Sequence, residues 1–365
     1  MALERLILTT GGTGGHIFPA LAVAEALRRN RPQARVLFVG GKSGPEGRLC
    51  QRAGIEFLAL PVRGVVGRGL RAVGAMAALA SAFVQAVRLV RSFRPQVVAG
   101  FGGYASFPAM AAAAVLGVPT VLHEQNSVPG VSNRLLGRLA RAVLLSFPDA
   151  LQRFPAATAT LTGNPVRQNI AALQALPRAN SGERRLLVLG GSQGAVAVND
   201  AVIAALPRFK AAGMAILHQA GERDADRVRA AYIAAGWPAD CVHAFIDDMA
   251  AAYAWADLAV CRAGASTVFE LAAAGLPAVC IPFPFATHNH QAVNARHLEQ
   301  AGAALCLEQQ ELSRRDLAGE IIALLDNPER LAAMGQAARA WARPEAAADI
   351  AAVLDRLAAP ARKTA

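Results

Sequence analysis

The chain of 365 residues is poor in cysteine, in aromatic residues and in long apolar runs. Its five cysteines are scattered and form no C-x-x-C pair, which disfavours a zinc site or disulfides and favours buried thiols in a reducing compartment. The uncharged stretch from Ala72 to Val87 is too short and too rich in alanine to cross roughly 30 Å of hydrocarbon. Residues 1–10 are typical of a first strand and not of a secretory signal. We therefore expect a cytoplasmic protein without a membrane-spanning helix.

Acidic residues are scarce in the first half of the chain. Residues 1–165 hold 18 Lys and Arg against 6 Asp and Glu, a net charge of +12, whereas residues 166–365 hold 19 and 20, a net charge of −1. Such an asymmetry indicates an anionic partner for the first half. That half has a single Tyr and no Trp to stack on bases, so the sequence favours an anionic membrane surface over nucleic acid.

An amphipathic stretch lies between arginines in the same half. The apolar residues Val73, Met76, Leu79 and Phe83 are spaced by three, three and four positions, so they share one helical face. This face is a candidate membrane-docking surface, and a core-facing helix with solvated arginines at its ends is the alternative.

Apolar runs of strand length alternate with Ala- and Leu-rich runs of helix length throughout the chain. Strands are expected near residues 3–9, 35–39, 96–100, 119–122 and 142–146, and then near 186–190, 214–218, 257–260, 278–281 and 304–307. This alternation predicts an α/β fold with a parallel sheet in each half. We expect domains at residues 1–163 and 164–342, and a C-terminal helix within 343–365 that packs back on the first domain.

Two glycine clusters carry the chemistry. Gly11 to His16 and Gly190 to Gly194 each follow an apolar strand and precede a helix-like stretch. Bare backbone N–H groups at the positive end of a helix dipole attract anions. Two such loops predict two phosphate-bearing ligands and hence a transferase. Because Ile17 replaces the third glycine of a dinucleotide loop and the next strand ends in Gly40-Gly41 without an acidic residue, NAD is disfavoured.

Further polar clusters follow other strands. Gly100 to Tyr104 and His123 to Asn126 lie where open α/β sheets bind ligands. His16 is a general base, a phosphate contact or a helix cap. Glu270 either binds the hydroxyls of a ribose or is an acidic residue in the first turns of a helix, where such residues are common.

The remaining motifs are ambiguous or weak. Ser192 also satisfies the G-x-S-x-G elbow of hydrolases, although holding a phosphate is the simpler role. His288 and His290 lack nearby cysteine or carboxylate, so no metal and no cofactor are expected. Asp224-Ala225-Asp226 resembles a metal clamp of other sugar transferases, but its charged surroundings are typical of an exposed helix start.

Seven motifs in register resemble the MurG family of bacterial glycosyltransferases over almost the whole chain. They are Gly11 to His16, Gly100 to Tyr104, His123 to Asn126, Gly163 to Arg167, Gly190 to Gly194, Phe245 to Met249 and Arg262 to Glu270. The resemblance implies a GT-B architecture, in which two Rossmann-like parallel-sheet domains face across a cleft. It implies that N-acetylglucosamine moves from UDP-N-acetylglucosamine to the 4-hydroxyl of undecaprenyl-pyrophosphoryl-N-acetylmuramyl-pentapeptide (lipid I). The product is lipid II, a β1→4-linked precursor of peptidoglycan in cell wall biosynthesis.

The resemblance also implies the site residues. Donor contacts are expected from Thr13, Gly14, Gly15, Asn126, Arg167, Ser192, Ile246, Ala265, Ser266, Thr267, Val268, Phe269, Glu270 and Gln291. Ser192 and Arg167 would hold the diphosphate, and Glu270 the ribose. Gly12, Gly102, Gly103 and Tyr104 would receive the acceptor pyrophosphate. The general base is His16 or Glu124, and the residues do not decide between them.

The lipid-linked acceptor places the expected enzyme on the cytoplasmic face of the inner membrane, as a peripheral protein. The alternatives are another GT-B enzyme, such as a glycolipid transferase or a UDP-sugar 2-epimerase, and a noncatalytic protein that binds nucleotide sugars. An epimerase needs no lipid-facing patch, and a binding protein releases no UDP.

Overall fold

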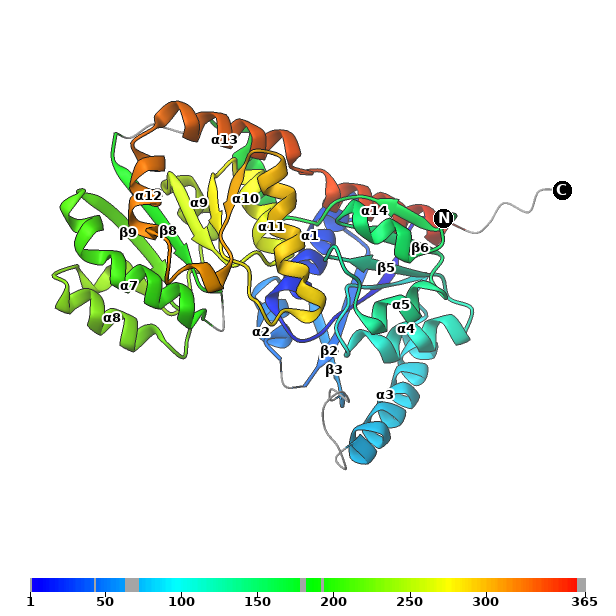
Figure 1. Cartoon of the computed structure of the whole chain (residues 1–365). Helices are drawn as coiled ribbons and strands as arrows, with labels where there is room; N and C mark the ends of the chain where they lie inside the picture. The colour runs from blue at the N-terminus through cyan, green and yellow to red at the C-terminus, as the bar shows by residue number, and fades with distance from the viewer. Residues whose placement is uncertain (1, 43, 63–71, 178–181, 192–193, 360–365) are drawn as a thin grey trace. The chain divides into compact units, whose positions relative to one another are not determined.

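The computed structural model describes residues 2–42, 44–62, 72–177, 182–191 and 194–359, with the backbone alone at 72–76 and 287. The chain divides into two compact units, which are described separately below (Figure 1). The N-terminal unit comprises Met1–Gln168 and Glu345–Ala365, and the C-terminal unit comprises Asn169–Pro344. The chain therefore leaves the first unit at residue 168 and returns to it at residue 345.

The N-terminal unit is built on a seven-stranded sheet whose order is β3-β2-β1-β4-β5-β6-β7. All its pairings are parallel. The strands are β1 (Arg5–Thr9), β2 (Arg35–Gly41), β3 (Glu56–Leu60), β4 (Val97–Gly100), β5 (Thr120–Glu124), β6 (Ala142–Leu145) and β7 (Ala159–Leu161). Its helices are α1 (Gly14–Asn30), α2 (Glu46–Arg52), α3 (Ala72–Phe93), α4 (Ser106–Val115), α5 (Val131–Gly137) and α14 (Ala346–Ala358), with a 3-10 turn η2 (Pro148–Arg153).

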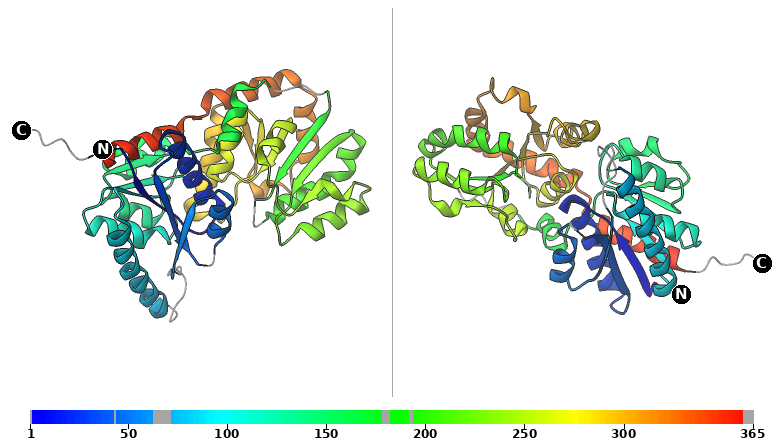
Figure 2. Two further views of the ribbon diagram at one scale, coloured as in Figure 1. Left: turned by 180° about the vertical axis from the view of Figure 1, so that it is seen from behind. Right: turned by 90° about the horizontal axis from the view of Figure 1, so that it is seen from below.

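Two hydrophobic cores cover the two faces of this sheet. Leu6 and Leu8 of β1 pack with residues of α1 and α14, whereas Ile7 packs with residues of α3 and α4. Successive side chains of a strand point to opposite faces, so an almost continuous apolar strand supplies both cores. The views from behind and from below in Figure 2 show helices on both faces of this sheet.

Helix α14 belongs to the N-terminal unit, although it is last in the chain. Ile350 and Leu354 are fully buried in the same core as α1. Asp355 accepts two hydrogen bonds from the Arg31 guanidinium, at 3.1 and 2.8 Å, and one from the backbone N–H of Leu3. The C-terminal helix thus covers α1 on the first sheet.

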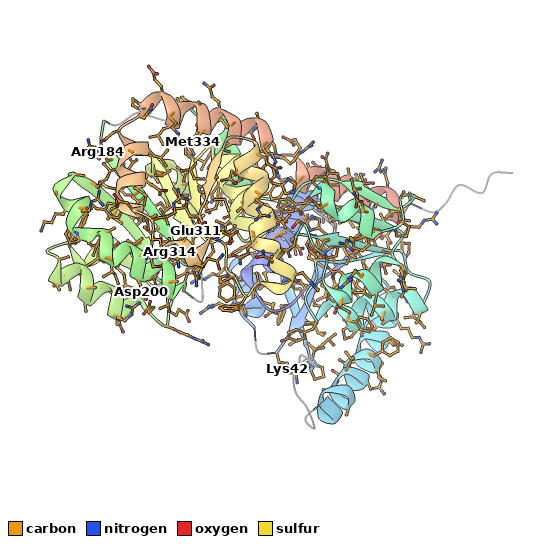
Figure 3. The ribbon with its side chains drawn as sticks, in the orientation of Figure 1. Lys42, Arg184, Asp200, Glu311, Arg314 and Met334 are labelled. Carbon is orange, nitrogen blue, oxygen red and sulfur yellow. The ribbon has the colours of Figure 1, made fainter. Side chains whose placement is uncertain are left out.

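The C-terminal unit has a six-stranded parallel sheet in the order β10-β9-β8-β11-β12-β13. Its strands are β8 (Arg184–Leu189), β9 (Met214–Gln219), β10 (Val242–His243), β11 (Leu258–Cys261), β12 (Ala278–Cys280) and β13 (Ala304–Cys306). The helices are α7 (Val196–Ala211), α8 (Ala225–Ala234), α9 (Met249–Trp255), α10 (Ala265–Ala274), α11 (His290–Gln300), α12 (Leu317–Leu325) and α13 (Pro328–Trp341), and α6 (Gln168–Ala171) precedes them. Met334 of α13, labelled in Figure 3, joins the buried core of this unit.

Both sheets reverse their strand order at the strand that carries the glycine loop. In the N-terminal unit the order changes direction between β1 and β4, and in the C-terminal unit it changes between β8 and β11. A crevice opens at such a switch point, beyond the carboxyl ends of the strands, because the neighbouring connections leave in opposite directions. Gly11 to His16 and Gly190 to Gly194 begin at these two points.

The predicted fold class, two Rossmann-like parallel-sheet domains, is confirmed. The ten expected strands are present, but the sequence analysis missed β3, β7 and β10. These three lie at sheet edges. The strands β7 and β10 are only three and two residues long, whereas β3 was missed although residues 57–60 form an apolar run. The chain crosses into the second unit at residue 168 instead of the expected 163, because Val166 is buried and Arg167 packs on Phe18 in the first unit.

The helix expected to carry the membrane-docking face is α3. Leu79 and Phe83 are half-buried, and Phe83 packs against the core beneath α3. The side chains of Val73 and Met76 lie outside the described residues. No helix in the described part of the chain is long and apolar enough to cross a membrane.

Candidate functional site

The N-terminal glycine loops touch each other through their backbones. A Cβ on Gly103 would lie 2.2 Å from the carbonyl oxygen of Gly11, and a Cβ on Gly11 would lie 2.3 Å from the Cβ of Ala105. Gly103 also has a φ of +78°, in the left-handed region that favours glycine. Side chains at these positions would push the loop after β1 away from the loop after β4. The close contact therefore fixes the start of α1 beside the start of α4.

A buried carboxylate that the sequence analysis did not identify lies against the first loop. Glu46, at the start of α2, is 1% exposed, and its Oε1 accepts the N–H of Gly12 at 3.0 Å. Gly12 was expected to help receive a pyrophosphate, and a carboxylate at that N–H opposes a second anion. A lone glutamate among loop glycines gives no pattern in the sequence, so only the fold reveals this contact.

A chain of hydrogen bonds orients His16. Gln125 donates through Nε2 to the carbonyl of Phe101 at 2.8 Å, so its Oε1 faces Nδ1 of His16 at 2.9 Å. A carbonyl accepts only, which fixes the orientation of the Gln125 amide and makes Nδ1 of His16 the protonated ring nitrogen. Nε2 of His16 is then the nitrogen with the lone pair, the form that a general base requires.

His123 completes this chain as a neutral group. Its Nδ1 accepts from Nε2 of Gln125 at 3.1 Å, and its Nε2 donates to the carbonyl of Gly163, also at 3.1 Å. Burial lowers the pKa of His123 to about 4. An uncharged His123 keeps the Gln125 amide in one orientation at neutral pH.

Glu124 is enclosed by donors. Its Oε1 accepts the N–H of Asn126 at 2.9 Å, and its Oε2 accepts from Nδ2 of Asn133 at 2.8 Å. The side chain is 1% exposed, and burial raises the pKa of the carboxyl, while the hydrogen bonds partly oppose that change. Both oxygens are thus occupied in holding Asn126 and α5 in place. Asn133 is a further residue that the sequence analysis did not identify.

Arg167 lies beside the start of α1. Its guanidinium carbon is 4.6 Å from the ring centroid of Phe18, and that ring lies over Gly14. A guanidinium stacked on an aromatic face keeps its planar donors aligned. Arg167 therefore belongs to the N-terminal unit, together with the expected site residues Thr13, Gly14, Gly15, His16, Gly102, Gly103, Tyr104, Glu124 and Asn126.

The C-terminal glycine loop has the same design. Gly190 donates to the carbonyl of Gln219 at 2.9 Å, and a Cβ on Gly194 would lie 2.7 Å from the carbonyl oxygen of Ala220. The loop therefore rests on the end of β9 and leads into α7. Ser192, the expected diphosphate contact, lies outside the described residues.

The remaining expected donor residues surround the ends of β9 and β11. The N–H of Ile246 donates to Oε1 of Gln219 at 3.0 Å, so this backbone is held by a side chain that the sequence analysis did not identify. Glu270 is 8% exposed, and its Oε2 accepts from the Tyr253 hydroxyl at 2.9 Å. Val268 and Phe269 are core residues, so a ligand at the start of α10 meets backbone and the small side chains at 265–267.

Gln291 lies at the start of α11. Its Oε1 accepts the N–H of Phe283 at 3.0 Å, which ties α11 to the loop after β12. His288 and Asn289 have positive φ angles in the turn before this helix. Ile246, Glu270 and Gln291 thus share the carboxyl-end side of the second sheet.

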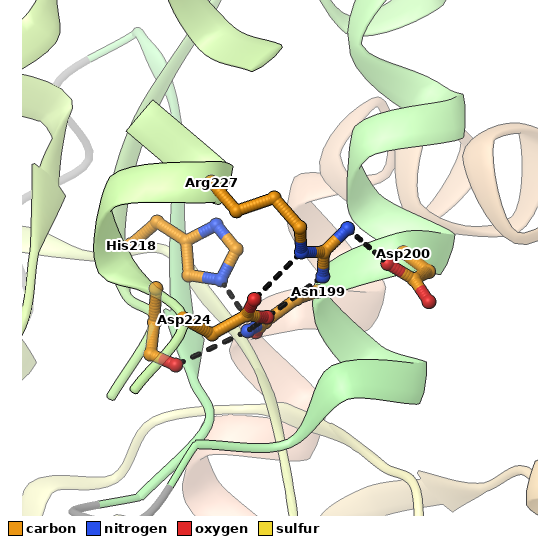
Figure 4. Close-up of polar contacts among 6 residues, drawn as sticks. Asn199, Asp200, His218, Asp224 and Arg227 are labelled. Atoms are coloured by element: carbon orange, nitrogen blue, oxygen red, sulfur yellow. Dashed lines mark hydrogen bonds and ion pairs between the residues drawn. The ribbon is translucent and has the colours of Figure 1, made fainter. Parts of the chain in front are cut away.

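The interpretation of Asp224 as part of an exposed helix start is wrong. Asp224 is 8% exposed and bonds to Asn199 and Arg227 (Figure 4). Asp226, two residues later, is 99% exposed in its side chain. Within the described residues, no group of three or more His, Cys, Asp or Glu is arranged to hold a metal ion.

Two parallel-sheet units, each with a glycine loop that leads into a helix at its switch point, are the architecture of Rossmann-like proteins that bind phosphate-bearing ligands. The chain belongs to glycosyltransferase family 28. Residues 6–145 match the N-terminal domain of that family, and residues 185–353 match its C-terminal domain.

Relatives of full length support this assignment. A protein of Solidesulfovibrio magneticus is 54% identical over 98% of this chain and 99% of its own length, and one of Nitratidesulfovibrio vulgaris (strain DSM 19637 / Miyazaki F) is 53% identical over 95% and 96%. Both are named UDP-N-acetylglucosamine--N-acetylmuramyl-(pentapeptide) pyrophosphoryl-undecaprenol N-acetylglucosamine transferase. The crystal structure of Acinetobacter baumannii MurG is 33% identical, with a TM-score of 0.74 over 97% of this chain and 99% of that one.

The neutral state of His123 predicts a pH dependence of stability. Its pKa is about 4 in the folded protein and about 6.5 when unfolded, so the unfolded chain binds the extra proton first. The N-terminal unit therefore loses stability as the pH falls from about 6.5 to about 4, by up to roughly 3 kcal/mol from this group. His123→Gln is expected to flatten that loss, measured by urea unfolding read through hydrogen exchange of β5 amides. The exposed His243→Gln serves as control, and an unchanged slope in His123→Gln would contradict the prediction.

Proposed function

We propose that this chain transfers N-acetylglucosamine from UDP-N-acetylglucosamine to the 4-hydroxyl of undecaprenyl-pyrophosphoryl-N-acetylmuramyl-pentapeptide. The reaction inverts the anomeric carbon, forms a β1→4 bond and releases UDP. The observation that carries this proposal is full-length similarity, at 53–54% identity, to relatives named for that transfer. A putative UDP-N-acetylglucosamine 2-epimerase of Listeria monocytogenes has a TM-score of 0.67 at 16% identity, which supports a common fold alone.

In this proposal the C-terminal unit binds the donor. The N-terminus of α7 and the glycines before it hold the diphosphate, together with Ser192. Because the N–H of Ile246 donates to Gln219, we assign the uracil contact to the Ile246 carbonyl. Glu270, anchored by the Tyr253 hydroxyl, binds the ribose hydroxyls. Gln291 binds hydroxyls of the sugar.

The N-terminal unit receives the acceptor and the proton. We assign the pyrophosphate to the loop of Gly102, Gly103 and Tyr104 and not to Gly12, whose N–H already binds the Glu46 carboxylate. His16 is the general base, since its Nδ1 bonds to Gln125 and Nε2 accepts the proton of the attacking hydroxyl. Glu124, with both oxygens bonded to Asn126 and Asn133, is a positioning residue.

The leaving group carries its own charge. Amides and a helix dipole stabilise the negative charge that develops on UDP as the bond to C1 breaks. Gly190 and Gly194 support this stabilisation, because both rest against the end of β9.

We also propose that the N-terminal unit docks on the anionic cytoplasmic face of the membrane as a peripheral protein. Val131, Leu135 and Leu139 are 63%, 50% and 62% exposed and recur every four residues along α5 and its end. Arg134 and Arg138 are exposed beside them, and the first half of the chain carries the excess positive charge. Apolar side chains flanked by arginines suit an interface of anionic lipids. This stripe is more exposed than Leu79 and Phe83 on α3.

The transfer is tested by UDP release from UDP-N-acetylglucosamine with and without a short-chain lipid-linked muramyl-pentapeptide. We expect release only with the acceptor, and a large rise of the donor KM in Glu270→Ala because the ribose loses its carboxylate. Release without acceptor would point to an epimerase or a hydrolase. Donor binding without turnover would indicate a noncatalytic protein that binds nucleotide sugars.

The two candidate bases are separated by their kinetics. His16→Ala is expected to lower kcat by about 10²- to 10⁴-fold and to remove the ascending limb of the pH profile, since no other group takes the proton. Glu124→Gln keeps that limb and acts mainly on substrate KM, because it disturbs Asn126. The reverse pattern in steady-state assays from pH 5 to 9 would make Glu124 the base.

Membrane docking is tested by sedimentation with vesicles containing anionic phospholipid. Leu135→Asp with Leu139→Asp is expected to weaken binding about tenfold or more, since charges replace apolar groups at the interface. The matched control is Ile233→Asp, which changes a 55% exposed residue of the C-terminal unit. Normal vesicle binding by the double variant would exclude this stripe as the docking surface.

A further inference from the structure

An ion pair between the buried Asp224 and the half-exposed Arg227 lies next to the residues that support the C-terminal glycine loop. Asp224, at the start of α8, accepts from Nε and Nη2 of Arg227 at 2.6 and 2.7 Å (Figure 4). Arg227 also pairs with Asp200 of α7 at 2.7 Å. Hydrogen bonds from Arg227 lower the pKa of Asp224, which therefore stays ionised. The pair thus connects the start of α8 to the first turns of α7.

Asn199 connects Asp224 to the carbonyl that supports the loop. It is fully buried in the first turns of α7, and its Nδ2 donates to Asp224 Oδ2 at 2.7 Å and to the Ala220 carbonyl at 3.1 Å. The same carbonyl is the atom that a Cβ on Gly194 would approach within 2.7 Å. One oxygen atom therefore contacts both the amide of Asn199 and the backbone of the loop.

His218 fixes the other side of Asn199. Its Nε2 lies 3.0 Å from Asn199 Oδ1, and its Nδ1 lies 2.9 Å from the Tyr232 hydroxyl. Since Nδ2 of Asn199 donates to a carboxylate and a carbonyl, Oδ1 must accept, so His218 donates through Nε2. Burial lowers the pKa of His218 to about 3 and keeps it neutral. The Asn199 amide is held in a single orientation.

The helix offers its own matched comparison. Asp226 and Arg229 form a second pair with the same three-residue spacing, at 2.7 Å. Asp226 is 99% exposed and has no part in the network around Asn199, whereas Asp224 is buried within it. The two pairs share their residue types and spacing, but only the Asp224 pair contacts Asn199 and through it the loop.

We propose that Asp224, held by Arg227, is a positioning residue for the donor diphosphate. Through Asn199 and the Ala220 carbonyl it fixes the N-terminus of α7 and the glycines before it against the end of β9. This inference rests on the proposed donor site. A misplacement of the loop weakens contacts to the phosphates, because backbone N–H donors require short and aligned bonds.

The uracil end is held by other contacts. Ile246 is bound by the Gln219 side chain, and the N–H of Ala220 donates to the carbonyl of His243 at 2.9 Å. Loosening of α7 therefore affects the diphosphate more than the nucleoside. This difference separates positioning of the loop from general destabilisation of the unit.

The test compares Asp224→Asn and Arg227→Gln with Asp226→Asn and Arg229→Gln in the full-length chain. For the first two we expect the donor KM and the Kd of UDP to rise about tenfold, while the Kd of uridine changes less than about twofold. The exposed pair is expected to leave all three constants within about twofold. Arg227→Gln keeps the test valid if Asp224→Asn folds poorly, since the Arg227 side chain is half exposed. Far-UV circular dichroism and thermal unfolding monitor the fold.

Three outcomes would overturn the inference: unchanged UDP binding in both Asp224→Asn and Arg227→Gln, equal weakening of UDP and uridine, or the same losses in the control pair. Failure of the proposed function looks different, because the unmodified chain would then show no UDP release that depends on the lipid-linked acceptor. Recovery of UDP affinity in Arg227→Lys relative to Arg227→Gln would support the charge as the acting feature.

Discussion

The whole site depends on one constraint, the close approach of backbones where a parallel strand ends in glycines and a helix begins. Gly11 and Gly103 touch in the first unit, and Gly194 rests on the Ala220 carbonyl in the second. Only a residue without a side chain fits at these contacts. The approach brings the N-terminus of α1 or α7 to the switch point of its sheet, where backbone N–H groups and the helix dipole attract anions. Rigid sheets with two apolar faces hold both loops in place.

A buried carboxylate lies near each glycine loop, and the two carboxylates have different effects on anion binding. Glu46 contacts the N–H of Gly12 directly and makes that position unfavourable for phosphate. Asp224 lies one layer behind its loop and acts through Asn199. A negative charge in contact with a loop amide takes the place of a ligand, whereas one behind the loop holds it without competing. A carboxylate therefore opposes anion binding when it bonds to a loop N–H, and supports the loop when another residue lies between them.

Each unit contains a buried neutral histidine, and the two histidines have different roles. Each has a histidine kept neutral by burial and bonded to a side-chain amide, His123 to Gln125 and His218 to Asn199. In the first unit the amide orients His16, which takes part in proton transfer under the proposed mechanism. In the second unit it orients a backbone carbonyl. Neutral imidazoles suit both tasks, because they set a hydrogen-bond direction without adding charge near the substrates.

The sequence by itself determined the class of fold and the strands at which the glycine loops begin. Alternating apolar runs require parallel sheets, and glycines between a strand and a helix mark the switch points. These signals are local, so one chain suffices to read them. The edge strands β7 and β10 were missed, because such short strands form by pairing with a neighbour, and β3 was missed although it contains an apolar run. Glu46, Asn133, Asn199 and Gln219 were also missed, since each acts through a partner distant in sequence.

Asp224 and Asp226 are alike in sequence, and only the packing of α8 on α7 decided which is buried. Tertiary structure alone made these choices, because burial and hydrogen-bond direction depend on neighbours that the sequence does not place.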